Sequence, residues 1–470
     1  MKVEQIYTGC LAEAAYFISS NGEAAVIDPL RDPKPYLQRA EKEGVKIKYV
    51  ILTHFHADFV SGQNDLASAT GATIVIGPTA KPGYDARVAT DGEILKIGDV
   101  DLEVLHTPGH TMESSTFLLK DESGKDHCIF SGDTLFIGDV GRPDLAVKSD
   151  LSKEDLAGLL FDSLRNKIMP LADDVIVYPN HGAGSACGKN MSKETFATLG
   201  NQKETNYALR ADMTKEEFVE ELLDGIAPPP QYFPKNAAIN RSGQMDDYSK
   251  VLERGTVPLD VSTFQAMANH EGAIVLDTRN QREFVKESIP GSIFIGIDGG
   301  FAPWVGALIS DLNQPMVIVA PKGREEEVVM RLSRVGYDNS LGYLEGGLEA
   351  WKKAGLPVQT IDSISSTEFA SQYTSDMNVA DVRKPGEFFS EHVENAINLP
   401  LDFINENMSE WDKNKTYYIH CAGGYRSVIA ASILASRGYD KLINIEGGFA
   451  EMKKTELPHT AYRCASEMTE

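Results

Sequence analysis

The first third of the chain alternates short apolar runs with polar turns and one amphipathic stretch. Residues 6–20 and 23–30 are typical of a hairpin that buries one face, and residues 33–44 of an amphipathic helix. Residues 46–59 begin as a buried strand and run into a loop. The rhythm of strand and loop continues over residues 73–77, 93–98, 101–109, 115–120, 127–136 and 174–182. Strands with intervening helices predict two sheets covered outside by helices, an α/β sandwich.

The segment 225–243, GIAPPPQYFPKNAAINRSG, interrupts this pattern. Three consecutive prolines and a fourth at position 234 favour an extended arm or linker. Two roles fit such a segment: a passive connector, or an arm that wraps over a neighbouring site. We expect the first domain to cover residues 1–245, with this arm at its C-terminal end.

Beyond residue 255 the chain repeats itself. Residues 275–295 match residues 379–399, and the Glu-Gly-Gly segments around Gly346 and Gly447 also correspond. Each copy alternates strands with helices, which predicts a small parallel sheet with helices on both faces. The expected boundaries are 256–358 for the first copy and 359–470 for the second. The predicted fold class is therefore α/β multidomain.

Composition excludes several classes of function. The chain has 470 residues, 42% of them hydrophobic, with a net charge of −24, so a nucleic-acid partner is not expected. No apolar run reaches the roughly 18 residues of a membrane helix, and the first residues do not resemble a signal peptide. Five scattered cysteines, at positions 10, 128, 187, 421 and 464, do not form a disulfide scaffold. These features predict a cytoplasmic protein without a membrane partner.

Histidines and aspartates follow the predicted strands of the first domain at their ends. Two histidines, His54 and His56, and Asp58 follow one strand, and three further residues follow separate strands: His110, Asp133 and His181. Loops that meet above a sheet allow such side chains to converge, and imidazole and carboxylate are metal ligands. The pattern predicts a metal site.

This order, HxHxD followed by His, Asp and His, resembles the metallo-β-lactamase superfamily over residues 1–235, which implies an αβ/βα sandwich with metal between the sheet edges. Ester and thioester hydrolases of that superfamily usually carry HxHxDH, but here Phe59 occupies the last position. A phenyl ring donates no lone pair, so a second metal loses a ligand. What remains is similar to the persulfide dioxygenases, which hold one iron.

That resemblance implies Fe(II), one per chain, held by His54, His110 and Asp133, a set that non-haem iron prefers. His56 and Asp58 are then outer residues that orient the ligands, and His181 is either an outer residue or a substrate contact. Direct ligation by His56, as in zinc relatives, is the alternative. Arg142, in Gly-Arg-Pro-Asp, resembles a dioxygenase segment and could fix a substrate anion or the Asp133 loop, or simply pair with an aspartate. Cys187 resembles a cysteine that would face the persulfide, the alternative being an inert residue in a turn.

A second reactive group follows the apolar strand of the last copy. His420 and Cys421 precede a glycine-rich turn and a helical stretch, which places the thiol at a helix N-terminus. Backbone N–H groups and the helix dipole favour an anion there, and Arg426 adds positive charge. The predicted cradle for a thiolate or persulfide comprises Cys421, Ala422, Gly423, Gly424, Tyr425 and Arg426.

This loop resembles the rhodanese signature Cys-x-x-Gly-x-Arg over residues 360–460, whereas phosphatase loops are one residue longer. The first copy has Ala320 to Glu325 in its place and no cysteine, so we interpret it as an inactive rhodanese-like domain.

The whole order resembles persulfide dioxygenase–rhodanese fusions. It implies that a thiol persulfide and O₂ give sulfite and thiol, and that a Cys421 persulfide converts sulfite to thiosulfate, in sulfide detoxification. A homo-oligomer is compatible with this family. The alternatives are a zinc-dependent glyoxalase II-like thioester hydrolase fused to a rhodanese, and a sulfide-responsive carrier in which the metal domain is incidental.

Overall fold

The computed structural model describes residues 1–145, 151–270 and 272–463. The chain forms two compact units, each described by itself below. The N-terminal unit comprises Met1–Tyr248 with Ser333–Gly336, and the C-terminal unit comprises Ser249–Leu332 and Tyr337–Glu470. Cys464, one of the five cysteines, lies outside the described residues.

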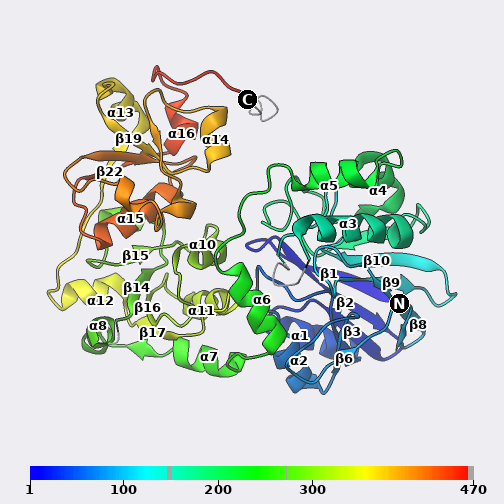
Figure 1. Ribbon diagram of the computed structural model, residues 1–470. Coiled ribbons are helices and arrows are strands. Elements are labelled where there is room, and N and C mark those ends of the chain that lie inside the picture. The colour runs from blue at the N-terminus through cyan, green and yellow to red at the C-terminus, as the bar shows by residue number, and fades with distance from the viewer. Residues whose placement is uncertain (146–150, 271, 464–470) are drawn as a thin grey trace. The chain divides into compact units, whose positions relative to one another are not determined.

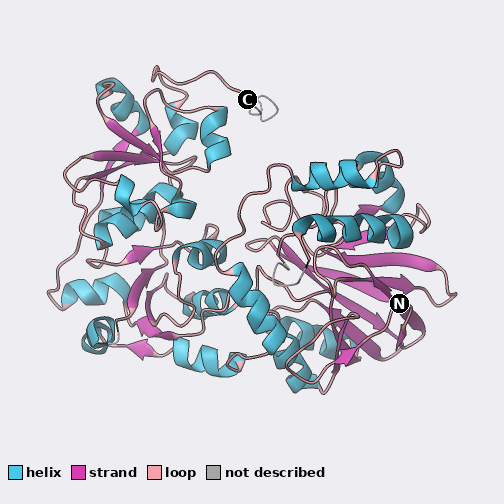
Figure 2. Ribbon diagram, in the orientation of Figure 1, coloured by secondary structure: helices cyan, strands magenta, loops and turns pink. Residues whose placement is uncertain are grey.

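The N-terminal unit is a sandwich of two six-stranded sheets with helices outside both (Figures 1 and 2). Strands of the first sheet pair in the order β1-β2-β3-β4-β5-β6, antiparallel up to β3 and parallel from there on. Their bounds are β1 Lys2–Thr8, β2 Glu13–Ser20, β3 Glu23–Ile27, β4 Lys46–Leu52, β5 Thr73–Ile76 and β6 Arg87–Val88. Helices α1 (Lys34–Glu43) and α2 (Gln63–Thr70) pack on its outer face through Tyr36, Ala40 and Leu66.

The second sheet has the order β12-β11-β10-β9-β8-β7. Its strands are β7 Ile94–Ile97, β8 Val100–His106, β9 Ser115–Lys120, β10 Asp126–Gly132, β11 Ile176–Pro179 and β12 Ala197–Thr198. Its outer helices are α3 Lys153–Ser163, the π-helical turn η1 Leu164–Ile168, α4 Leu199–Thr205, the 3₁₀ turn η2 Tyr207–Leu209 and α5 Lys215–Leu223. Apolar side chains of both inner faces, among them Tyr16, Val104, Phe117 and Phe130, form the core between the sheets.

The proline-rich segment differs from the extended arm that its sequence favours. Residues 226–230 form neither helix nor strand, and after a turn at residues 231–232 α6 (Phe233–Ser242) begins, with Pro234 in its first turn. Proline is tolerated there because the first N–H groups of a helix have no intrahelical partner. The second half of the segment is therefore a helix, and α7 (Tyr248–Gly255) follows it.

The C-terminal unit contains two five-stranded parallel sheets with the same strand order. The first copy has β13 Pro258–Leu259, α8 Val261–His270, β14 Ile274–Asp277, α9 Gln281–Lys286, β15 Ile293–Phe294, α10 Phe301–Leu308, β16 Met316–Val319, α11 Glu325–Ser333, β17 Ser340–Leu344 and α12 Gly347–Lys353. The second has β18 Asp362–Ser365, α13 Ser366–Gln372, β19 Asn378–Asp381, α14 Pro385–Ser390, β20 Ile397–Asn398, η3 Leu401–Phe403, η4 Met408–Glu410, β21 Tyr417–His420, α15 Arg426–Ser436, β22 Leu442–Glu446 and α16 Gly448–Met452.

The repeated Asp-x-Arg motif has the same local geometry in both copies. Asp277 accepts from Arg279, and Asp381 accepts from Arg383, with a closest N–O distance of 2.6 Å in each pair. Both aspartates are buried at the end of a strand, so the pair fixes the loop that follows.

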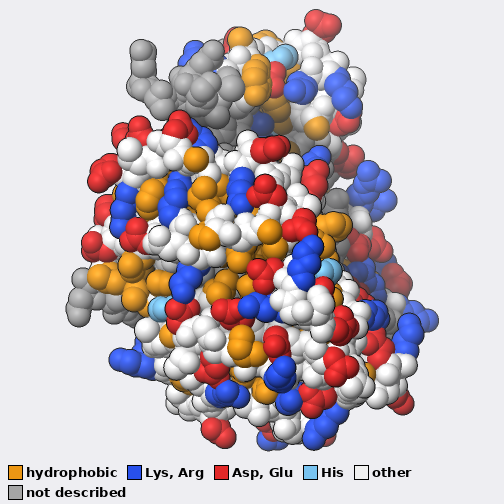
Figure 3. Space-filling model, turned by 90° about the vertical axis from the view of Figure 1, so that its right-hand side faces the viewer, with side chains coloured by type: hydrophobic (Ala, Val, Ile, Leu, Met, Phe, Trp, Pro, Cys, Tyr) orange, Lys and Arg blue, Asp and Glu red, His pale blue; other side chains and the backbone are white. Residues whose placement is uncertain are grey.

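The predicted fold class, a sandwich followed by two small parallel-sheet domains, is confirmed. Acidic and basic side chains are interspersed over the face drawn in Figure 3. Among the described residues, no helix is long and apolar enough to cross a bilayer.

Candidate metal centre and thiol loop

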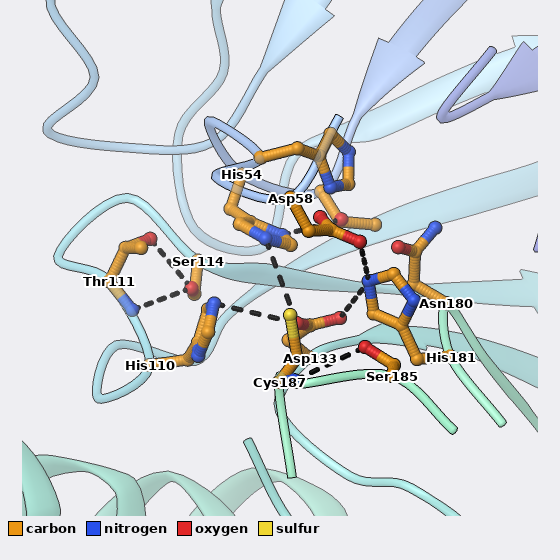
Figure 4. Close-up of polar contacts among 12 residues, drawn as sticks. His54, Asp58, His110, Thr111, Ser114, Asp133, Asn180, His181, Ser185 and Cys187 are labelled. Carbon is orange, nitrogen blue, oxygen red and sulfur yellow. Dashed lines mark hydrogen bonds and ion pairs between the residues drawn. The ribbon is translucent and has the colours of Figure 1, made fainter. Parts of the chain in front are cut away.

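The predicted metal residues converge where loops leave the carboxyl ends of strands (Figure 4). His54, His56 and Asp58 lie in the loop after β4. The others follow β8, β10 and β11: His110, Asp133 and His181. All six are at most 5% exposed, so they form a buried polar cluster between the two sheets.

One subset could hold an ion with two imidazoles and a carboxylate. Ligand atoms of His54, His110 and Asp133 all lie within 4.8 Å of one another. Oδ2 of Asp133 is 3.9 Å from Nε2 of His54 and 3.5 Å from Nε2 of His110. The other nitrogen of each ring is hydrogen-bonded: Nδ1 of His54 lies 3.0 Å from Thr53 Oγ1, and Nδ1 of His110 lies 2.7 Å from the Arg142 carbonyl oxygen. These contacts orient both Nε2 atoms toward Asp133.

A second subset lies beside it. Ligand atoms of His56, Asp58 and His181 also fall within 4.8 Å of one another. Nε2 of His181 is 3.4 Å from Asp58 Oδ2 and 3.7 Å from Asp133 Oδ1. Asp133 therefore faces both subsets, one with each carboxylate oxygen.

Unpartnered atoms show that the cluster fits a cation. Both oxygens of Asp133, Oδ1 of Asp58, Nδ1 of His56 and Nε2 of His181 are buried and accept or donate no hydrogen bond. Such atoms are costly unless something pairs with them. Burial, together with the neighbouring histidines, lowers the pKa of His54 well below its usual range, so this imidazole is neutral, the form that binds metal.

Phe59 lies against this cluster and contributes no ligand atom. Its side chain is fully buried and stacks on His56, with ring centroids 4.3 Å apart and planes at 26°. The loop position that carries histidine in HxHxDH sequences thus supplies packing instead.

Two residues that the sequence analysis missed hold the metal loop in place. Asp28, directly after β3, accepts from Thr53 N and Oγ1, both at 2.8 Å, and lies 2.9 Å from His56 Nε2. Asn240 of α6 donates 2.7 Å hydrogen bonds to the carbonyls of His56 and Phe59. The position of Asp28 at a strand end was a usable signal, but nothing in the local sequence marks Asn240.

We expect Asp28→Asn to lower metal affinity about 10–100-fold, the usual effect of losing an outer residue that orients a ligand. The amide places an N–H group where four donors now converge, from Thr53, His56 and Asn180, so His56 and the loop backbone lose their orientation. Competition with a chromophoric chelator measures the affinity. Asp32→Asn is the matched control, because that half-buried carboxylate accepts from Lys34 N and donates nothing to the metal cluster. Equal affinity in a folded Asp28→Asn chain would contradict the prediction.

Arg142 is committed to protein contacts. Its guanidinium donates to both oxygens of Asp144 at 2.6 Å and to the carbonyls of Ala186 and Ala227. Its own carbonyl oxygen faces His110. This geometry is that of the Arg–Asp pair considered from the sequence, and a contact with substrate stays a prediction.

Cys187 lies inside the cluster rather than at its rim. Its sulfur belongs to a third group of ligand atoms within 4.8 Å, together with Asp133 and His181. The residue is 1% exposed, and burial raises the pKa of its thiol well above the ordinary value. Figure 4 shows the sulfur directed toward Asp133 and His54.

The thiol loop of the second copy surrounds Cys421 with backbone. Gly424 N lies 3.1 Å from the sulfur, and Ser427 Oγ lies 3.8 Å from it. The carbonyl of Cys421 accepts from Phe449 N at 2.7 Å. Gly448 permits this approach, since its φ is +57° and a Cβ there would lie 2.3 Å from that carbonyl oxygen. Ala422, Gly423 and Tyr425 complete the turn before α15.

Arg426 is paired at the mouth of this loop. Its two terminal nitrogens bind the carboxylate of Glu387 at 2.6 and 2.8 Å. Burial alone would lower the pKa of Arg426, but Glu387 raises it above the ordinary value. The guanidinium is therefore held in one place as a permanent cation.

The corresponding loop of the first copy is closed by its own side chains. Ala320 follows β16 as Cys421 follows β21, so the nucleophile's position carries a methyl group. The N–H of Gly323 donates to Glu325 at 3.1 Å, and Arg324 binds Asp298 and Glu327 at 2.5 and 2.7 Å. Gly323, at the position of Gly424, thus already donates its N–H group to a carboxylate of the chain.

Comparison with known proteins matches both parts of the chain. The model of the metallo-beta-lactamase superfamily matches residues 8–181, and that of the rhodanese-like domain matches residues 260–354 and 366–455. Hydroxyacylglutathione hydrolase GloC of Haemophilus influenzae is 30% identical over 205 residues, covering 39% of this chain and 85% of its own. Human mitochondrial persulfide dioxygenase ETHE1 is 31% identical over 211 residues, covering 44% and 74%. A crystal structure of a Staphylococcus aureus metallo-beta-lactamase aligns with a TM-score of 0.64 at 32% identity, covering 73% of this chain and 98% of that one.

Proposed function

The chain belongs to the metallo-beta-lactamase superfamily, with two rhodanese-like domains after its metallo-beta-lactamase domain, and from this premise we propose that it is a bifunctional sulfur-oxidising enzyme. In the first reaction a low-molecular-weight thiol persulfide, O₂ and water give sulfite and the thiol. In the second, Cys421 takes the outer sulfur of another thiol persulfide, which leaves as the thiol, and passes that sulfur to sulfite, giving thiosulfate and the free Cys421 thiol. Coupling the two reactions would remove toxic sulfide.

The observation that carries the dioxygenase half is the ligand set around Asp133. His54, His110 and Asp133 supply two imidazoles and one carboxylate within 4.8 Å of one another, the set that non-haem Fe(II) prefers. Phe59 occupies the position of the last histidine in HxHxDH, so a second metal beside this set would lack one ligand. A single Fe(II) per chain, when bound, would activate O₂ for transfer to the terminal sulfur of the persulfide.

The chain's own residues would orient the reactants. Thr53 and the Arg142 carbonyl fix the two imidazoles, and Asp28 fixes His56. Cys187 reaches the cluster with its sulfur, so we propose that it faces the persulfide, with Arg142 bracing the loop behind it. The buried setting would exclude bulk water while oxygen is transferred.

The sulfurtransferase half rests on the Cys421 loop. The Gly424 N–H points at the sulfur, and α15 begins at Arg426, so backbone dipoles favour an anion there. Arg426, fixed by Glu387, would attract anionic sulfite. The proposal includes domains at 1–245, 256–358 and 359–470, a cytoplasmic location, no nucleic-acid partner, and room for a homo-oligomer.

A zinc-dependent thioester hydrolase fused to a rhodanese is the second candidate. The observation in its favour is the cluster of His56, Asp58 and His181, which offers a second ion three ligand atoms. The 30% identity to GloC, a hydroxyacylglutathione hydrolase, supports this candidate about as much as the 31% identity to ETHE1 supports the first.

Metal analysis and O₂ uptake distinguish the two candidates. Protein purified without oxygen is analysed for iron and zinc, then given glutathione persulfide at an oxygen electrode and, separately, a hydroxyacylglutathione thioester. The proposal expects about one iron per chain, the capacity of a single 2-His-1-carboxylate site, and O₂ consumption with sulfite formed. Stoichiometric zinc with thioester hydrolysis, and no O₂ uptake after iron reconstitution, would favour the hydrolase.

A further inference from the structure

Tyr425, in the thiol loop of the second rhodanese-like copy, binds the cysteine-less first copy. Its hydroxyl donates to the Gly296 carbonyl at 2.6 Å, and its ring meets that of Phe294 with centroids 5.8 Å apart. Both partners belong to the first copy, 129 residues away in the case of Gly296. Tyr425 therefore connects the loop around Cys421 to a different sheet of the same unit.

The local role of residue 425 does not explain a tyrosine. This position is the N-cap of α15, where Ser, Thr, Asp or Asn is preferred because a short side chain can accept from the first N–H groups. Tyr425 makes no such cap hydrogen bond. The side chain is directed instead to the first copy, and a departure from local preference of this kind marks a residue with a tertiary role.

The backbone of the first copy packs closely against the Tyr425 ring. Gly299 lies against it so closely that a Cβ would come within 2.3 Å of the ring atom Cζ. Beside it, α15 and the edge strand β15 lie together, and Ser432 Oγ accepts from Phe294 N at 3.0 Å (Figure 1). Two hydrogen bonds and one ring packing thus join the thiol loop and its helix to the first copy.

The segment that receives Tyr425 is itself held firmly by the first copy. Arg331 of α11 donates to the Ile297 carbonyl at 2.7 Å, and Ile297 N donates to the Thr278 carbonyl at 3.0 Å. Arg324, which occupies in the first copy the position of Tyr425, binds Asp298. Arg324, in the loop of the first copy, therefore holds the same segment that binds Tyr425 of the Cys421 loop.

We propose that the cysteine-less copy is a scaffold for the thiol loop, and that Tyr425 is the positioning residue through which segment Gly296–Gly299 fixes Cys421 and Gly424. This inference rests on the proposed sulfur transfer at Cys421. It gives the inactive copy a function that needs no ligand, in agreement with the Gly323 N–H group of its loop being already bonded to Glu325.

Tyr425→Phe tests the link with the ring retained. We expect the kcat for sulfur transfer from thiosulfate to cyanide to fall about fivefold, the factor of one hydrogen bond, with KM changed less than kcat. Because Gly424 N would no longer be held against the sulfur, the rate of Cys421 alkylation at neutral pH should fall relative to its rate at alkaline pH. Peptide mass spectrometry after iodoacetamide treatment gives that ratio for Cys421 alone.

Gly299→Ala and Tyr439→Phe complete the design. The first variant adds a methyl group in the other copy that collides with the Tyr425 ring, and should change both readouts in the same direction as Tyr425→Phe. The second removes a tyrosine hydrogen bond to the Trp411 carbonyl within the second copy, away from the loop, and should lower only the melting temperature.

Wild-type values of kcat and of the alkylation ratio in Tyr425→Phe would overturn the inference, as would equal changes in Tyr439→Phe. If the wild-type chain transfers no sulfur, the proposed function fails, whereas the alkylation ratios still decide whether the first copy positions the loop. Should Gly299→Ala fail to fold, Tyr425→Phe decides alone.

Discussion

Replacing Asp133 by alanine is expected to leave the chain without stoichiometric metal and to reduce O₂ uptake more than about a hundredfold, because loss of even an outer supporting residue costs about 10–100-fold. Asp133 faces both subsets of the cluster, with one oxygen toward His110 and the other toward His181. Both oxygens are buried and make no other hydrogen bond. Elemental analysis and an oxygen electrode measure the two effects on the same preparation.

The matched control is Asp174→Asn in the same unit. Asp174 pairs with Lys125 on the surface, where its side chain is 60% exposed, so its loss should change neither metal content nor O₂ uptake. Because alanine also removes a buried carboxyl group whose oxygens accept no hydrogen bond, the metal-free Asp133→Ala chain should unfold at no lower temperature than metal-free wild type. Full iron content in this variant would refute the assigned ligand set.

Replacing Cys421 by serine is expected to abolish sulfur transfer, by on the order of a thousandfold or more, while leaving O₂ uptake intact. A hydroxyl in this loop cannot hold sulfane sulfur as a persulfide. The sulfur of Cys421 is the atom to which Gly424 N points, and no other thiol follows a strand in this copy within the described residues. With glutathione persulfide the variant should release sulfite where the wild type releases thiosulfate, as ion chromatography can show.

Cys10→Ser is the control for this experiment, since Cys10 is a half-buried free thiol of the N-terminal unit without a place in either proposed site. It should retain both reactions. Loss of O₂ uptake together with sulfur transfer in Cys421→Ser would mean that the two reactions share one site, and would contradict the bifunctional proposal.

The strand pattern and the repeat were sufficient to predict the fold. Apolar runs that end in His or Asp mark strands entering loops, and the structure places β4, β8, β10 and β11 at those runs. The two matching segments around Asp277 and Asp381 predicted two similar parallel sheets, which share one strand order. Both features can be recognised locally, because each strand pattern lies within one strand and each repeat lies within one domain-sized segment of the sequence.

The contacts that support the sites could not be predicted in the same way. Asn240 reaches the metal loop from a helix whose sequence suggested an extended arm, and Glu387 occupies Arg426 from another helix. Such pairs depend on where elements pack in the tertiary structure, and each partner alone is an ordinary polar residue. Tyr425 is the clearest example, since its partner carbonyl carries no sequence signal.

The hydrogen bonds of Asn240 also set an order of events during synthesis. This residue closes contacts with His56 and Phe59 across 184 and 181 positions of the chain. Both sheets of the sandwich are complete by Thr198, well before α6 leaves the ribosome. The nascent chain can therefore form the core between the sheets before Asn240 supports the HxHxD loop. The HxHxD loop therefore gains the two hydrogen bonds of Asn240 only after every strand of the sandwich has been synthesised.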